Sequence, residues 1–129
     1  ESVLTSENRN VAQLCAKSVS DIFDYLNIKK EFFLSSNLNY DKTLPAADKL
    51  IAMAGVLTAS NYINSPGGKT LYSKEYFIEN RVNLSFIEME KIKYQQGKND
   101  FVPNLSMIDV LMWNSKEQVE ELLTKYKLV

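Results

Sequence analysis

Residues 61–70, Asn-Tyr-Ile-Asn-Ser-Pro-Gly-Gly-Lys-Thr, decide how we interpret the fold of this chain. Tyr62-Ile63-Asn64 is a short run that Ser65-Pro66-Gly67-Gly68 interrupts, which predicts a strand followed by a tight turn. The two glycines would let the backbone approach a ligand closely, and a helix beginning after them would present free N–H groups to an anion. Lys69 would add a positive charge. The segment therefore predicts an anion-binding turn at the end of a strand.

The same segment also ends like a phosphate-binding P-loop, but it lacks the first glycine of that motif. A P-loop needs a glycine five residues before the one that precedes Lys69, and Ile63 stands at that position. Pro66-Gly67 would also justify a plain strand-to-helix turn with no ligand. Two interpretations stay open: an anion-binding turn and a purely structural one.

Helices are expected on both sides of this turn. Apolar residues recur at three- and four-residue steps between Val11 and Leu26, so one face of that helix, which includes Cys15, is predicted to be buried. Pro45 suits the first turn of a second helix over 46–57. A third helix is expected over 73–79.

Two further runs are typical of strands. Glu31-Phe32-Phe33-Leu34 resembles a central parallel strand buried on both faces, and the turn-forming Ser35-Ser36-Asn37 ends it. Leu84 and Phe86 alternate with polar residues in a strand that extends toward Met89. The alternation of helices and strands predicts a single α/β domain over 1–129, with three layers and a short, mostly parallel sheet between helices.

The pattern changes after Glu90. Residues 91–104 are polar and are predicted to form an excursion over the surface. Ser106 and Ser115 suit the N-cap positions of two C-terminal helices, over 107–113 and 116–125.

Composition limits the classes of function. The chain has 129 residues and a net charge of −1, which argues against nucleic acid as a partner. It has no histidine, so a Ser-His-Asp triad and a His-ligated zinc site are excluded within this chain, while a Ser-Lys arrangement remains open. One cysteine suits a reducing cytoplasm, and no apolar stretch is long enough to span a bilayer.

Candidate ligand contacts follow from the predicted sheet. Ligands bind beyond the carboxyl ends of parallel strands, and residues 35–37, 64–70 and 88–90 are expected to reach that edge. Asp109 stands among apolar neighbours, so its carboxylate is either hydrogen-bonded within the protein or poised at a site. The candidate ligand-binding residues are Ser35, Ser36, Asn64, Gly67, Gly68, Lys69, Gln96 and Asp109. The sequence assigns no catalytic residue, metal ligand or cofactor.

Glu88 and Glu90 could act together, because they stand two residues apart at a strand end. Paired carboxylates can perform acid–base chemistry or hold a metal. Lys91 and Lys93 stand beside them, which favours solvated side chains instead.

Two blocks of residues carry a family resemblance. The first comprises Tyr62-Ile63-Asn64, Gly67-Gly68 and Leu71-Tyr72, and the second comprises Tyr94, Gln96, Phe101-Val102-Pro103, Leu105-Ser106, Ile108-Asp109-Val110-Leu111 and Asn114. They resemble the WbqC-like family of bacterial proteins, which is associated with O-antigen and other surface-polysaccharide gene clusters. One departure is Thr58, where we expect a glycine to close the second helix. A β-branched residue tolerates a left-handed φ poorly, so that helix end is expected to be built differently.

The resemblance implies that the chain is the C-terminal part of a longer protein. Members of the family open with a Pro- and aromatic-rich segment, and nothing here resembles it. The implied activity is a cytoplasmic transferase of surface-polysaccharide synthesis that binds a small anionic or nucleotide-linked substrate, and the fragment alone is expected to be inactive. The alternative is a non-catalytic interaction or scaffold protein of polysaccharide assembly. The expected partner is the missing N-terminal half, and the surface it would cover predicts either a homodimer or reduced solubility.

Overall fold

The computed structural model describes residues 5, 7, 10–98 and 100–129. The chain forms two compact units, Glu1–Leu38 and Asn39–Val129. That residues 1–129 act as one domain stays a prediction.

The first unit is built on helix α1, Val11–Tyr25, which agrees with the predicted helix. The helix begins at Asn10, whose side chain accepts a hydrogen bond of 3.1 Å from the Gln13 N–H. Leu26 is the C-cap residue, and Asn27 after it has a left-handed φ of 57°. A short 3-10 helix, η1, follows at Ser35–Asn37.

The strand predicted at residues 31–34 is wrong, because residues 29–34 form neither helix nor strand. The Phe32 ring packs edge-on against Phe23 of α1, with 5.2 Å between ring centroids. Phe32 and Phe33 are each about half exposed. The segment therefore packs on α1 through this aromatic contact and does not pair with a strand. The predicted burial of Cys15 is also wrong, because Cys15 is exposed.

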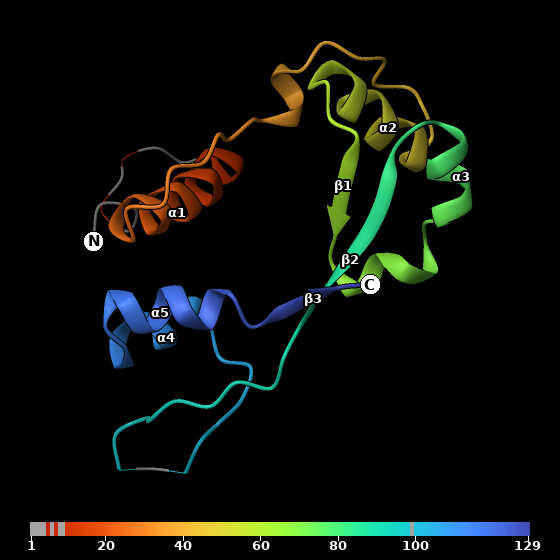
Figure 1. Cartoon of the computed structure of the whole chain (residues 1–129). Coiled ribbons are helices and arrows are strands. Elements are labelled where there is room, and N and C mark those ends of the chain that lie inside the picture. The colour runs from red at the N-terminus through yellow and green to blue at the C-terminus, as the bar shows by residue number, and fades with distance from the viewer. Residues whose placement is uncertain (1–4, 6, 8–9, 99) are drawn as a thin grey trace. The chain divides into compact units, whose positions relative to one another are not determined.

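The second unit contains a three-stranded sheet of order β1-β2-β3 (Figure 1). Strand β1, Asn61–Asn64, runs parallel to β2, Asn83–Met89, and places Tyr62 beside Leu84. Strand β3, Tyr126–Leu128, runs antiparallel to β2. The strands predicted in the Tyr-Ile-Asn run and in the alternating run from Leu84 are thereby confirmed.

The prediction of a mostly parallel sheet is wrong, because the last residues of the chain form the antiparallel strand β3. The final helix, α5, Lys116–Leu123, ends before the predicted 125. The chain then pairs with β2: Phe86 and Val129 exchange two backbone hydrogen bonds of 2.8 and 3.0 Å. The Glu90 N–H donates to the Lys125 carbonyl at 2.9 Å. One parallel and one antiparallel pairing make the sheet mixed.

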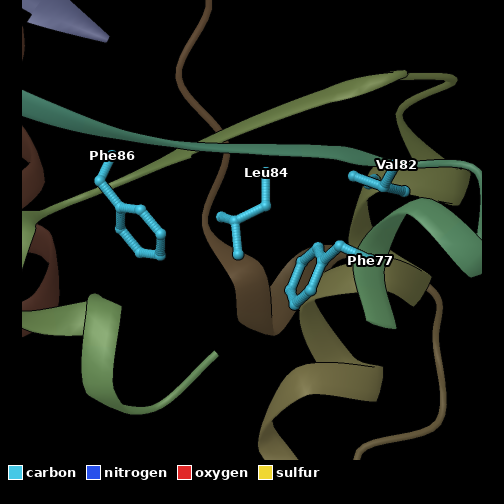
Figure 2. Close-up of a cluster of buried hydrophobic side chains, with 5 residues drawn as sticks. Phe77, Val82, Leu84 and Phe86 are labelled. Atoms are coloured by element: carbon cyan, nitrogen blue, oxygen red, sulfur yellow. The ribbon is translucent and has the colours of Figure 1, made fainter. Parts of the chain in front are cut away.

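Helices α2, Ala46–Val56, and α3, Lys74–Glu79, supply the core on one face of the strands. Figure 2 shows Leu84 and Phe86 projecting from the same side of β2 toward Phe77 of α3. Alternate strand residues share a face, so these two side chains are buried together. Ile63, on the opposite face of β1, is 51% exposed. The structure confirms an α/β fold but does not confirm a three-layer arrangement.

Helices α2 and α3 end in the same hydrogen-bond pattern, and in neither does a glycine occupy the left-handed position after the helix. After α2, the Thr58 N–H donates to the Gly55 carbonyl at 3.1 Å and the Ala59 N–H to the Ala54 carbonyl at 2.8 Å, which is a Schellman motif. Thr58 has a φ of 52°, and Arg81 after α3 has a φ of 63°. The expectation that Thr58 alters the helix end is therefore wrong, because Thr58 adopts the left-handed conformation itself.

The two predicted C-terminal helices are confirmed as α4, Met107–Trp113, and α5. Ser115 opens α5 with a capping box: its hydroxyl accepts from the Gln118 N–H at 3.3 Å, and its own N–H donates to the Gln118 Oε1 at 2.8 Å. In the described part of residues 91–104 there is no helix or strand.

Candidate functional site

The Gly67-Gly68 segment forms a 3-10 helix, η2, Pro66–Thr70, directly after β1. The Gly68 carbonyl accepts hydrogen bonds from the N–H groups of Leu71 and Tyr72, both at 3.0 Å. Helix α3 begins only at Lys74. The helix predicted over 73–79 is thereby confirmed as α3. A separate 3-10 turn lies between β1 and α3, so the glycines do not stand at the N-terminus of an α-helix.

Gly68 is buried, and its surroundings leave no room for a side chain. A Cβ at this position would lie 2.7 Å from Asn64 Nδ2 and 3.2 Å from Phe86 Cε1, whereas a Cβ at Gly67 would meet no atom within 4 Å. The Asn64 side chain also accepts a hydrogen bond of 2.7 Å from the Ser65 N–H. Packing against Asn64 and the Phe86 ring therefore favours a glycine at 68 without any ligand. Contact of Asn64, Gly67 and Gly68 with a ligand stays a prediction.

A pocket of about 430 Å³ lies beside this turn, within the range of roughly 300–1,000 Å³ that is typical of small-molecule sites. Its lining residues are Lys69, Tyr72, Ser73, Lys74, Glu75, Phe86 and Val129. Lys69 is the member of this set that belongs to the predicted ligand contacts. The lining combines two ammonium groups, one carboxylate and two aromatic rings.

Glu88 lies between two lysines. The Lys69 ammonium donates to Glu88 Oε1, and the Lys127 Nζ lies 3.5 Å from Glu88 Oε2. The hydrogen bond from Lys69 is the main cause that lowers the pKa of Glu88. All three side chains are partly exposed, so solvent screens these ion pairs.

Sequence reasoning missed the pairing of Glu88, which it treated as a solvated carboxylate. Glu88 stands 19 residues after Lys69, and no short motif connects them. The signal that could have found it is the predicted parallel pairing of their two strands. That pairing brings the chain after β1 close to the far half of β2.

Ser73 fixes one wall of the pocket. Its hydroxyl accepts from the Tyr76 N–H at 3.2 Å, which caps α3, and donates to Glu75 Oε2 at 2.7 Å. The hydrogen bond from Ser73 is the first cause that lowers the pKa of Glu75. The pocket therefore holds an ionised carboxylate at neutral pH.

Gln96 and Asp109 are joined in a second polar group, the Asp109 cluster, which comprises the side chains of Tyr94, Gln96 and Asp109 and the backbone of Val102. The Gln96 amide donates to Asp109 Oδ2 at 3.0 Å and to the Val102 carbonyl at 3.1 Å, and it accepts from the Val102 N–H at 2.7 Å. The Tyr94 hydroxyl donates to the same Asp109 oxygen at 2.6 Å, which raises the pKa of Tyr94. Gln96 is only 7% exposed.

These bonds tie the segment from Gln96 to Val102 to helix α4. Of the two alternatives for Asp109, the structure shows hydrogen bonds within the protein. A ligand role for Gln96 and Asp109 stays a prediction.

Ser35 and Ser36 belong to the first unit, in η1. Both are exposed, and the Ser36 hydroxyl donates to Asn37 Oδ1 at 3.3 Å. Their participation in a site with Lys69 stays a prediction.

Among the described residues, 5, 7, 10–98 and 100–129, the structure contains neither a metal-binding group of side chains nor a membrane-spanning helix. In that part of the chain, no three His, Cys, Asp or Glu side chains come together in a way that could hold a metal ion. Its helices are all too short or too polar to cross a membrane.

The fold and site define a small α/β chain with a lysine-containing pocket beside a glycine turn. Its sequence matches the WbqC-like protein family over residues 1–121 of 129, so the chain belongs to this family. The resemblance carried by the Tyr-Ile-Asn and Phe-Val-Pro blocks is thereby confirmed. No curated protein and no solved structure matches the chain.

Proposed function

We propose that the chain is the C-terminal part of a transferase of bacterial surface-polysaccharide (O-antigen) synthesis, and that its pocket holds the anionic group of a small or nucleotide-linked substrate. The association of WbqC-like proteins with polysaccharide gene clusters supports the biological role. The single cysteine suits a reducing cytoplasm, where we expect the protein to act. The observation that carries the proposal is that the ammonium groups of Lys69 and Lys74 line the same pocket.

The lining supplies complementary groups for such a substrate. The ammonium groups of Lys69 and Lys74 suit phosphate oxygens, and Tyr72 adds an aromatic wall against a base or sugar ring. Because its pKa is lowered, Glu75 is ionised at neutral pH. Its carboxylate therefore suits accepting hydrogen bonds from sugar hydroxyls more than donating a proton as a general acid.

Titration calorimetry with UDP and UDP-glucose tests this proposal. We expect Lys69→Met to weaken binding about 10- to 100-fold, because a hydrogen bond to a charged group contributes about 1.5–3 kcal/mol. Lys125→Met is the matched control: it also removes an ion-paired lysine, but Lys125 pairs with Glu121 and does not line the pocket. We expect it to change the affinity less than about twofold.

Two results would overturn the proposal. One is the absence of any heat of binding with either compound at millimolar concentration. The other is an equal loss of affinity in the two lysine variants, which would show that the net charge of the chain is responsible.

A second candidate function, a non-catalytic interaction protein, is favoured by apolar side chains on and before α4. Ile108 and Met112 are 66% and 74% exposed, and Val102 and Leu105 are about half exposed. Such a surface fits self-association. Light scattering after size exclusion would then show a dimer for the unmodified chain and a monomer for the Ile108→Lys, Met112→Lys double variant. A monomer in both cases rules this candidate out.

A further inference from the structure

We infer that Glu88 competes with the bound anion for Lys69 and weakens the binding of every anion, so that a group of higher charge, such as phosphate or diphosphate, is the class that occupies the pocket. The inference rests on the proposed function, because it concerns the same pocket. It adds the chemical class of the ligand and assigns an inhibitory role to a residue outside the lining.

The positions of the three charged side chains make the exchange feasible. Lys69 lines the pocket, whereas Glu88 reaches the Lys69 ammonium from β2 and does not line it. Lys127 of β3 approaches the other carboxylate oxygen of Glu88, at 3.5 Å. An anion that takes over Lys69 therefore leaves Glu88 with Lys127, so no carboxylate is left without a positive partner.

The competition depends on charge. Glu88 is attached to the same chain as Lys69, so its effective concentration at the ammonium reaches the order of millimolar or more. A free monocarboxylate offers Lys69 the same group and the same single charge, so it gains nothing by replacing Glu88.

A phosphate group differs in charge and in the number of acceptors. A phosphate monoester carries about two negative charges at neutral pH and three acceptor oxygens. It can attract Lys74 in the same lining while it holds Lys69. The exposed ion pair is weak enough for such a ligand to displace it.

The test measures dissociation constants of the full 129-residue chain for inorganic pyrophosphate, inorganic phosphate and acetate by calorimetry or NMR titration. In the unmodified protein, we expect pyrophosphate to bind most tightly and acetate least tightly. In Glu88→Gln, we expect all three to bind more tightly by a similar factor of up to about fivefold, because a competitor within the chain weakens every anion alike and an exposed ion pair contributes at most about 1 kcal/mol.

Glu90→Gln is the matched control. It removes the same charge from the same region of the chain, two residues further on, and Glu90 forms no ion pair among the described residues. We expect it to change each dissociation constant less than about twofold. An equal gain in both glutamine variants overturns the inference, because it would reflect only the net charge.

The outcomes separate this inference from the proposed function. If the unmodified chain binds pyrophosphate, Lys69→Met loses that binding and Glu88→Gln leaves the three dissociation constants unchanged, then the competition by Glu88 is wrong and the pocket stands. If neither the unmodified chain nor Glu88→Gln binds any of the three probes, then the proposed anion site itself is wrong.

Discussion

The pocket beside the glycine turn and the Asp109 cluster each contain a tyrosine and a carboxylate, but only the pocket contains lysines. Lys69 in the pocket and Gln96 and Asp109 in the cluster were predicted to contact a ligand. In the cluster, both amide hydrogens and the carbonyl oxygen of Gln96 are bound to Val102 and Asp109. In the pocket, the Lys69 ammonium is bound to Glu88, whose carboxylate is partly exposed. Hydrogen-bond groups that are all used within the protein hold the fold together, whereas the proposed anion site depends on charged groups that stay partly exposed.

The largest effect is expected in the Asp109 cluster. Gln96→Leu keeps a side chain of similar size but leaves the Val102 N–H and carbonyl without their partners, so we expect it to lower the free energy of unfolding by about 3 kcal/mol. Urea denaturation followed by circular dichroism measures this change.

Gln95→Leu is the control, because Gln95 is exposed and makes one hydrogen bond, of 3.3 Å, to the Gly97 carbonyl. We expect its effect to stay within about 0.5 kcal/mol. If the two variants are equally stable, the cluster is not structural, and the contrast with the pocket disappears.

A smaller effect is expected at the glycine turn. Gly68→Ala places a Cβ against Asn64 and the ring of Phe86, so we expect a loss of about 2 kcal/mol in the free energy of unfolding. Gly67→Ala, whose Cβ meets no atom, should stay within about 0.5 kcal/mol of the unmodified protein. An equal loss in both would mean that the turn needs glycine for its backbone conformation and not for packing.

The smallest effect concerns the ion pair of Glu88. Lys69 lowers the pKa of Glu88 in the folded protein below its ordinary 4.5, so the pair stabilises the fold above the unfolded pKa. This stabilisation is lost as the pH falls through the folded pKa.

The difference in unfolding free energy between the unmodified protein and Glu88→Gln should therefore be constant from about pH 6 to 8 and shrink below about pH 4.5. Urea denaturation at a series of pH values measures it. A difference that grows as the pH falls contradicts the direction of the pKa shift.

The sequence predicted those helix and strand ends that depend on residues next to them in the chain. The Ser-Pro-Gly-Gly turn marked the end of β1, and the serines before α4 and α5 marked where those helices begin. The strand predicted at residues 31–34 is wrong, because an apolar run does not show whether a second strand is available to pair with it. The sequence pattern also missed β3, whose pairing depends on β2 about forty residues earlier in the chain.

In the site, too, the sequence predicted the residues that local patterns mark and missed those that depend on contacts between distant segments. Lys69 follows from the turn that contains it, whereas Glu88 depends on strand pairing and Tyr94 on a contact 15 residues away. At Thr58, the preference of β-branched residues against a left-handed φ predicted a different helix end, and the structure does not follow it. The two backbone hydrogen bonds that close α2 hold this β-branched residue at a φ that it disfavours.

An NMR titration of the full chain with pyrophosphate tests most directly whether the pocket, and not the Asp109 cluster, binds the anion. We predict that amide signals of Lys69, Ser73 and Phe86 shift with one dissociation constant, while those of Gln96 and Asp109 do not move. Shifts confined to Gln96 and Asp109, with the pocket signals unchanged, would contradict the assignment of the site.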